Sequence, residues 1–162
     1  MFKKILFSFI LYLITYSSSS QQFIPEVSLK TLNGESIKSI EAINQDGFTI
    51  LSFWATWCIP CINELDAINE VISKWNDKEN IKVLAVSTDD SRSKKRVRPL
   101  INGKDWIFDI VSDTNQEFKR AVGVVGTPHT IIAYKSEIIH RRIGYTPGEE
   151  EDLFKIISNY KK

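Results

Sequence analysis

Two apolar runs with an amphipathic pattern between them most constrain the fold of this chain. The runs are 48–54 (FTILSFW) and 81–87 (IKVLAVS). Continuous apolar, β-branched and aromatic runs of this length are typical of strands buried on both faces. Between them, apolar residues recur at helical spacing, and polar residues fill the other positions. The apolar set is Ile62, Leu65, Ile68, Ile72 and Trp75, and the polar set is Asn63, Glu64, Asp66, Asn69 and Glu70. A strand, a helix and a strand in this order predict a parallel pair with a right-handed crossover.

The remaining pattern predicts an α/β fold with a central mixed sheet flanked by helices. Residues 21–40 alternate around a turn signal at Asn33-Gly34, which predicts an N-terminal β-hairpin. Further strands are expected over 108–111, 130–134 and 138–143, the last two as an antiparallel hairpin, with a short helix over 115–122.

Capping signals predict where two further helices begin. In the basic segment 89–106, Asp89 or Ser91 could cap a helix, and Pro99 should interrupt it. For the last helix, Thr146 and Glu149 form a capping-box pattern with proline at the first helical position.

The first 20 residues differ from the rest of the 162-residue chain. Lys3 and Lys4 precede an apolar run over 5–16 and four serines over 17–20. This order is typical of a secretory signal peptide, and about 12 apolar residues fall short of the roughly 20 that span a bilayer. An uncleaved anchor is the alternative. We therefore expect an exported protein, periplasmic or on the extracytoplasmic face of the membrane, with one domain over 21–162.

Charge and cysteine content narrow the function. The formal net charge is +1, so nothing in the overall charge indicates a nucleic-acid partner. The two cysteines, Cys58 and Cys61, directly follow the first buried run. A disulfide that closes so small a loop removes little entropy from the unfolded chain, so the pair is better explained by chemistry than by stabilisation.

The position of the two cysteines predicts unequal roles for them. At a helix N-terminus, Cys58 is expected to be the exposed nucleophile and is favoured as a thiolate, the reactive form. It would attack a substrate disulfide and form a mixed disulfide, which Cys61, one turn further in and more buried, would resolve.

Metal binding is the main competing explanation for a C-x-x-C pair. A closed zinc site needs four ligands, and only His129 and His140 could join the two cysteines. We therefore predict no metal and no cofactor.

Two motifs together resemble the TlpA/ResA-like branch of the thioredoxin superfamily. They are FWATWCIPC over 53–61 and GVVGTP over 123–128. The resemblance covers about Phe23 to Tyr160. It implies a thioredoxin-like fold with an N-terminal hairpin and an exported thiol–disulfide oxidoreductase, commonly a reductant in cytochrome c maturation. It also implies disulfide-bearing extracytoplasmic proteins as substrates and a membrane protein as electron donor.

The same resemblance assigns roles to residues around the cysteines. Pro128 matches the family's cis-proline, and the backbone of Thr127 would pair with an extended substrate. Glu64 matches a glutamate linked to proton handling and could take the proton from Cys61, with a solvated helix face as the alternative. Trp57 would line the rim where partners dock. Ser52 stands where thioredoxin has a buried acid, so a thioredoxin-type proton relay is not supported.

Two other features carry weaker functional predictions. A charged His129 could stabilise the Cys58 thiolate, although an ordinary strand position is the simpler explanation. The basic run from Arg92 to Arg98 is either a solvated face or a contact for anionic lipid or an acidic partner.

Two alternative functions stay open. A peroxiredoxin-like peroxidase shares the fold and the region Phe23-Ile24-Pro25, but its motif would need threonine at Ala55 and proline at Leu51. A binding or chaperone domain that keeps the fold would show no disulfide exchange. Peroxide consumption that persists without Cys61 would support the peroxidase.

Overall fold

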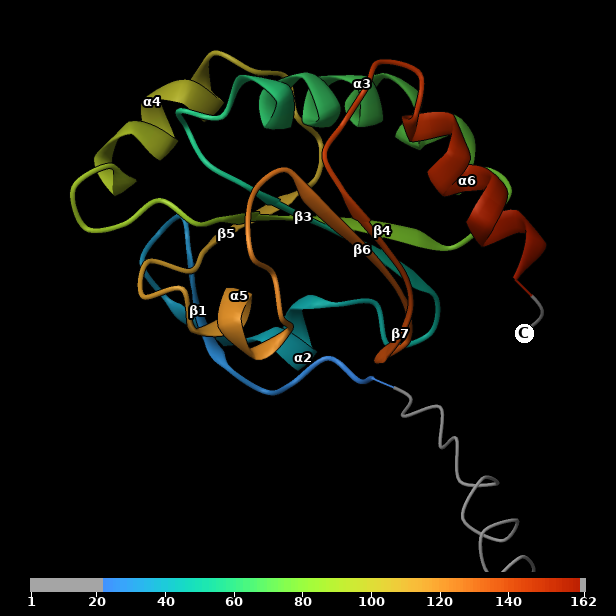
Figure 1. Cartoon of the computed structure of the whole chain (residues 1–162), viewed down its shortest axis with the longest axis horizontal. Coiled ribbons are helices and arrows are strands. Elements are labelled where there is room, and N and C mark those ends of the chain that lie inside the picture. Colours follow the sequence, from blue (N-terminus) through green and yellow to red (C-terminus); the bar gives the residue numbers. More distant parts are fainter. Residues whose placement is uncertain (1–21, 161–162) are drawn as a thin grey trace, which may run out of the picture.

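The computed structural model describes residues 22–160. Seven strands form one mixed sheet in the order β2-β1-β5-β4-β3-β6-β7. The strands are β1 Ser28–Thr31, β2 Ser36–Lys38, β3 Phe48–Trp54, β4 Ile81–Ser87, β5 Asp109–Ser112, β6 His129–Tyr134 and β7 Glu137–Ile143. The helices are α2 Ser39–Ala42, α3 Ile59–Asn76, the 3₁₀ helix η1 Lys94–Arg96, α4 Val97–Asn102, α5 Glu117–Ala121 and α6 Glu150–Asn159. Figure 1 shows the sheet with helices on both faces, as the sequence predicts.

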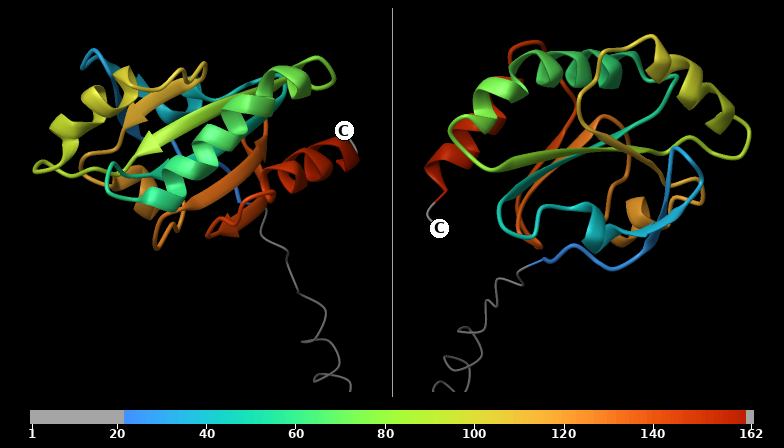
Figure 2. Two further views of the ribbon diagram at one scale, coloured as in Figure 1. Left: turned by 90° about the horizontal axis from the view of Figure 1, so that it is seen from above. Right: turned by 180° about the vertical axis from the view of Figure 1, so that it is seen from behind.

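The central β3-α3-β4 unit has the predicted form. β3 and β4 are parallel, with Phe48 opposite Ile81 and Trp54 opposite Ser87. All seven residues of β3 are buried, because helices cover both of its faces (Figure 2). β6 pairs with the other edge of β3 in the antiparallel direction. β3 is therefore the central strand that leads into Cys58.

The N-terminal hairpin extends the sheet at the far edge. β1 and β2 are antiparallel, with Leu29 opposite Ile37, and β1 also pairs with β5. The chain then forms α2, a short helix that the alternating pattern over 21–40 did not predict, because Ser39 and Ala42 are buried at helical rather than alternating spacing.

The hydrophobic core lies on both faces of the sheet. On one face, α3 and α6 cover apolar residues of β3, β4 and β6, among them Phe48, Ile50 and Ile132. On the other face, Phe53, Leu84 and Ile131 pack with Phe118 of α5. The two faces together fix β3 and hence the position at which the dithiol begins.

The prediction that Pro99 interrupts a helix is wrong. Helix α4 begins at Val97, so Pro99 lies in its first turn, where the missing N–H is not needed. The predicted caps are also wrong: Asp89 is buried, and it is Asp90 that accepts hydrogen bonds from the backbone N–H groups of Arg92 and Ser93 at 2.9 and 3.1 Å.

The predicted start of the last helix, at Pro147, is three residues early. Half of the capping box forms, because the Glu149 carboxylate accepts a 2.8 Å hydrogen bond from the Thr146 N–H. However, Gly148 has a φ of 98°, which a right-handed helix cannot include, so α6 starts at Glu150.

Within residues 22–160, no helix combines the length and apolar character needed to cross a bilayer. The predicted signal peptide over 1–20 lies outside the described residues.

Candidate active site

Cys58 and Cys61 form a disulfide at the start of α3. Their Cα atoms are 5.3 Å apart. Cys58 is the residue that precedes the first helical position, and its carbonyl accepts the hydrogen bond of the Ile62 N–H at 3.2 Å. First-turn N–H groups of a helix have no partner within the helix, so they favour negative charge beside them. The helix start therefore stabilises a thiolate at Cys58 once the disulfide is reduced.

The two sulfur-bearing residues differ in exposure, but less than expected. Cys61 is 0% exposed and Cys58 is 5% exposed, so the prediction of an exposed Cys58 is wrong for the disulfide form. Its neighbours Trp57 and Ile59 are 64% and 65% exposed. A partner that approaches the dithiol thus meets an apolar rim beside the more accessible of the two sulfurs.

A buried carboxylate holds the loop that connects β3 to the dithiol. Asp89 accepts hydrogen bonds from the Thr56 N–H at 2.9 Å and from the Thr56 hydroxyl at 2.7 Å. The Ser87 hydroxyl also donates to it, at 3.0 Å. Asp89 follows β4 directly, so the ends of the two parallel strands are tied together where the dithiol begins. The sequence pattern did not predict this role, because it indicated a helix cap at Asp89 instead.

Pro128 lies directly before β6, at the same end of the sheet as the dithiol. The Thr127–Pro128 peptide bond is cis, and Pro128 is buried. His129, the next residue, pairs with Phe53 near the end of β3. The N–H and C=O groups of Thr127 form no hydrogen bond with another residue between 22 and 160, and Thr127 is partly exposed. They are available to an extended peptide.

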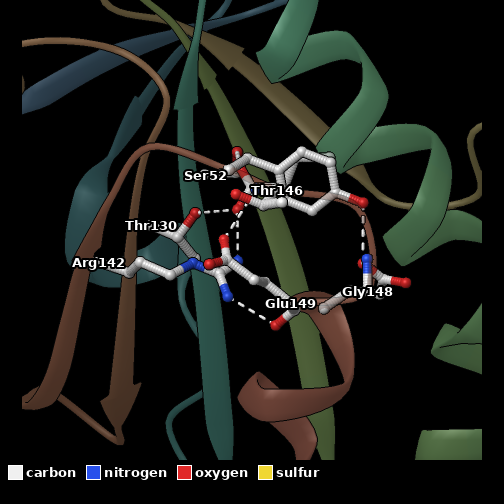
Figure 3. Close-up of polar contacts among 9 residues, drawn as sticks. Ser52, Thr130, Arg142, Thr146, Gly148 and Glu149 are labelled. Atoms are coloured by element: carbon white, nitrogen blue, oxygen red, sulfur yellow. Dashed lines mark hydrogen bonds and ion pairs between the residues drawn. The ribbon is translucent and has the colours of Figure 1, made fainter.

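Glu64 is buried, so the solvated helix-face alternative is wrong. It is 0% exposed and lies one turn after Cys61 on α3. Its carboxylate accepts hydrogen bonds from Thr130 at 2.6 Å, Arg142 at 2.9 Å and Ser52 at 3.2 Å. In Figure 3 the labelled side chains of Ser52, Thr130 and Arg142 lie close together, with dashed lines marking their contacts.

The three donors to Glu64 form a row across the sheet. Ser52 of β3 is opposite Thr130 of β6, and Thr130 is opposite Arg142 of β7. Directly opposed residues point to the same face of a sheet, so all three face α3. The buried acid of this site is thus Glu64 on α3, whereas the corresponding strand position holds Ser52.

Arg142 also joins this cluster to the start of α6. It donates to the Glu149 carbonyl at 2.6 Å and forms an ion pair with Glu64 in which the side chains are 15% and 0% exposed. Nearby, the Tyr145 hydroxyl donates to Glu150 at 2.8 Å. Desolvation, followed by this hydrogen bond, raises the pKa of Tyr145 to about 12. The role of Arg142 was not predicted from the sequence, although adjacent residues of a strand point to opposite faces. One of the two arginines 141 and 142 therefore had to face a helix.

The structure does not support a charged His129. The side chain is buried, and neither ring nitrogen has a hydrogen-bond partner among the described residues. Desolvation by burial lowers the pKa of His129, and the charge of Arg141 lowers it further. His129 is therefore held neutral and does not supply a cation to the Cys58 thiolate.

No group of three or more His, Cys, Asp or Glu side chains within residues 22–160 is arranged to hold a metal ion.

The fold and the dithiol define a class. A C-x-x-C pair at the start of the helix that follows the central strand of this sheet makes the protein a thiol–disulfide oxidoreductase with a thioredoxin-like fold. It belongs to the AhpC/TSA family, whose model matches residues 21–142.

Known proteins of the same kind support this assignment. The thioredoxin-like protein YneN of Bacillus subtilis is 34% identical over 119 residues, which are 73% of this chain and 67% of that protein. The thiol-disulfide oxidoreductase ResA of Bacillus thuringiensis is 29% identical over 109 residues, 65% of this chain; the chain matches only 61% of that protein's length. The solution structure of an uncharacterized thioredoxin-like protein from Porphyromonas gingivalis has a TM-score of 0.73 and 34% identity, and the match covers 86% of this chain and 94% of that one. The predicted resemblance to ResA-like proteins is confirmed.

Proposed function

We propose that the protein is exported, with residues 1–20 as its signal peptide, and reduces disulfides of extracytoplasmic proteins. Maturation of cytochrome c is one process that needs such a reductant. The observation that carries the proposal is the unequal dithiol, with Cys58 at the helix start beside an exposed apolar rim and Cys61 fully buried behind it.

The reaction has two steps in this proposal. The Cys58 thiolate attacks one sulfur of the substrate disulfide, a mixed disulfide forms, and the other substrate sulfur leaves as a thiolate. Cys61 then loses its proton, and its sulfur attacks Cys58. The second substrate thiolate is released, the Cys58–Cys61 disulfide forms, and two electrons have passed from the protein to the substrate. A membrane protein would supply the electrons that restore the dithiol.

Three further residues take part in this proposal. Glu64 receives the proton of Cys61, because it is buried one helical turn away and, among residues 22–160, its Oε2 accepts a hydrogen bond from Ser52 alone. The free backbone groups of Thr127, fixed before the buried Pro128, pair with the substrate segment. Trp57 contributes apolar contact area at the rim.

The reduction potential of the Cys58–Cys61 couple tests the direction of electron flow. We expect a value towards the reducing end of the superfamily's span of roughly −270 to −120 mV. The couple can be equilibrated with glutathione at fixed ratios and scored by tryptophan fluorescence. A potential near −120 mV would contradict the reductase function.

Trapping identifies the substrates. In Cys61→Ala the mixed disulfide cannot be resolved, so extracytoplasmic partners should accumulate as adducts of Cys58, whereas Cys58→Ala should trap none.

The same Cys61→Ala variant tests the alternative function as a peroxidase, which is considered because the chain belongs to the AhpC/TSA family. Sustained peroxide consumption by that variant would favour the peroxidase over the reductase.

A further inference from the structure

The basic segment beyond β4 carries cations that have no partner within the part of the chain that the structure describes. Arg92 pairs with Asp90 at 2.9 Å, and Arg98 donates to Leu32 and Asn33 of the N-terminal hairpin. By contrast, the exposed side chains of Lys94, Lys95 and Arg96 form no hydrogen bond or ion pair with another residue between 22 and 160. Three free positive charges therefore lie together on η1.

One of these cations lines a hollow that reaches the dithiol rim. The hollow has a volume of about 370 Å³, and its wall includes Arg96 of η1 and the exposed Trp57, which directly precedes Cys58. Thr88 and Gln116 supply polar groups to the same wall. A side chain placed in this hollow would thus meet Arg96 and lie beside Trp57, the residue before Cys58.

The negative charge in the hollow is already neutralised. Asp90 also lines it, but its carboxylate accepts hydrogen bonds from the Arg92 side chain and from the backbone N–H groups of Arg92 and Ser93. With Asp90 and Arg92 paired, Arg96 leaves the hollow with a net positive charge.

We propose that this hollow binds an acidic side chain next to the reacting cysteine of the partner protein. The proposal rests on the proposed function, which it deepens by naming the substrate class: disulfides in acidic segments. A guanidinium binds a carboxylate through charge-assisted hydrogen bonds, and Trp57 gives the neighbouring chain an apolar surface. Lys94 and Lys95 on the same 3₁₀ helix attract such a segment over a longer range.

A polypeptide fits these observations better than a membrane surface does. The hollow is concave and borders the residue before Cys58, so its occupant is positioned together with the reacting disulfide. A flat anionic surface would contact the outward lysines of η1 and would gain nothing from Arg96 within the hollow.

The test compares peptide disulfides that differ only in charge. Peptides of equal length carry Glu, Gln or Lys on both sides of one cysteine, and the reduced full-length protein reduces each of them. We expect kcat/KM for the acidic peptide to exceed that for the neutral one about tenfold at low salt, and the ratio to fall as salt is added.

Three variants locate the effect. Arg96→Gln should bring the acidic-to-neutral ratio close to one, and Arg96→Glu should reverse it in favour of the lysine peptide. Lys74→Gln is the matched control, because it removes the same charge from an exposed position near the other end of α3 and should leave the ratio unchanged.

Other outcomes overturn the proposal. Equal rates for acidic and neutral peptides, or a ratio that survives in Arg96→Gln, would exclude an acid-binding hollow. Binding to phosphatidylglycerol vesicles that is lost in Lys94→Gln/Lys95→Gln, with no peptide preference, would assign the segment to a lipid surface instead.

The small neutral substrate bis(2-hydroxyethyl) disulfide separates a failure of the acid-binding hollow from a failure of the disulfide reductase function. If the reduced protein cannot reduce this substrate, the reductase function is contradicted, whatever the peptides show.

Discussion

His129 illustrates how its surroundings decide what a residue can do. In the sequence it directly follows Pro128, which the family resemblance places beside the dithiol. A charged imidazole there could have stabilised the Cys58 thiolate. In the structure its side chain is buried and its ring nitrogens have no partner among the described residues. Burial without a hydrogen-bond acceptor disfavours the charged imidazole, and the pKa of His129 is lowered accordingly.

This burial predicts a pH dependence of stability. An unfolded histidine titrates near 6.5, whereas burial lowers the pKa of both His129 and His140 in the folded protein. Below about pH 6.5 the unfolded state therefore binds more protons, and the free energy of unfolding falls as the pH falls. Between pH 7.5 and 5.5 each histidine contributes at most about 1.4 kcal/mol of this loss.

Urea unfolding at the two pH values measures the loss. His129→Leu should flatten the dependence, and His140→Leu should remove a smaller part, because His140 is less buried. Carboxylates titrate mainly below this window, so they do not obscure the comparison. An unchanged slope in His129→Leu would show that the imidazole takes up a proton in the folded protein.

At the scale of elements, one ion pair connects four segments that lie far apart in the sequence. Glu64 is on α3, Thr130 on β6 and Arg142 on β7, and Arg142 reaches the Glu149 carbonyl at the start of α6 (Figure 3). Taking two charges out of water is costly, and the attraction and hydrogen bonds between them offset that cost only while all partners are present.

Removing one member of the Glu64–Arg142 pair should therefore lower the free energy of unfolding far more than removing both. Arg142→Met leaves the Glu64 carboxylate buried with hydroxyl donors alone, and we expect it to cost about 3 kcal/mol of unfolding free energy. The double variant Glu64→Gln/Arg142→Met removes the unpaired charge and should recover much of that loss. Urea denaturation followed by tryptophan fluorescence measures both. A double variant that is no more stable than Arg142→Met would show that the charge of Glu64 is not what makes the single substitution costly.

The same elements show what the sequence could predict. β3, α3 and β4 follow from local patterns, because a strand buried on both faces and an amphipathic helix each leave a periodic signature in their own residues. The dithiol and Pro128 were found because short motifs carry them. The partners of Glu64 were not, since a contact between residues 64 and 142 belongs to strand register rather than to any local pattern. Pro99 and the capping-box pattern of Thr146 and Glu149 gave wrong predictions for a related reason: the effect of each depends on which residue starts the helix.

At the scale of the whole molecule, β3 separates a reactive end from a structural end. Its last residue, Trp54, packs in one cluster with Cys58, Cys61 and Leu65. Its first residue, Phe48, packs in another cluster with Leu153 and Ile157 of α6. Six residues of extended strand separate the two ends by roughly 20 Å. Stability and reactivity should therefore respond differently to changes at the two ends.

Two matched core truncations test this separation. Leu153→Ala and Leu65→Ala each remove the same atoms from a side chain that is 0% exposed, so each should cost about 2–5 kcal/mol of unfolding free energy. Leu65→Ala leaves a cavity beside the cysteines and should also change the reduction potential and the rate at which the Cys58 thiolate reacts with iodoacetamide. Leu153→Ala should change neither under conditions where it is fully folded, because its cavity opens against Phe48 at the other end of β3. Equal changes of reduction potential in the two variants would contradict this separation. They would mean that packing across the whole face covered by α3 and α6, and not only around the start of α3, sets the chemistry of the dithiol.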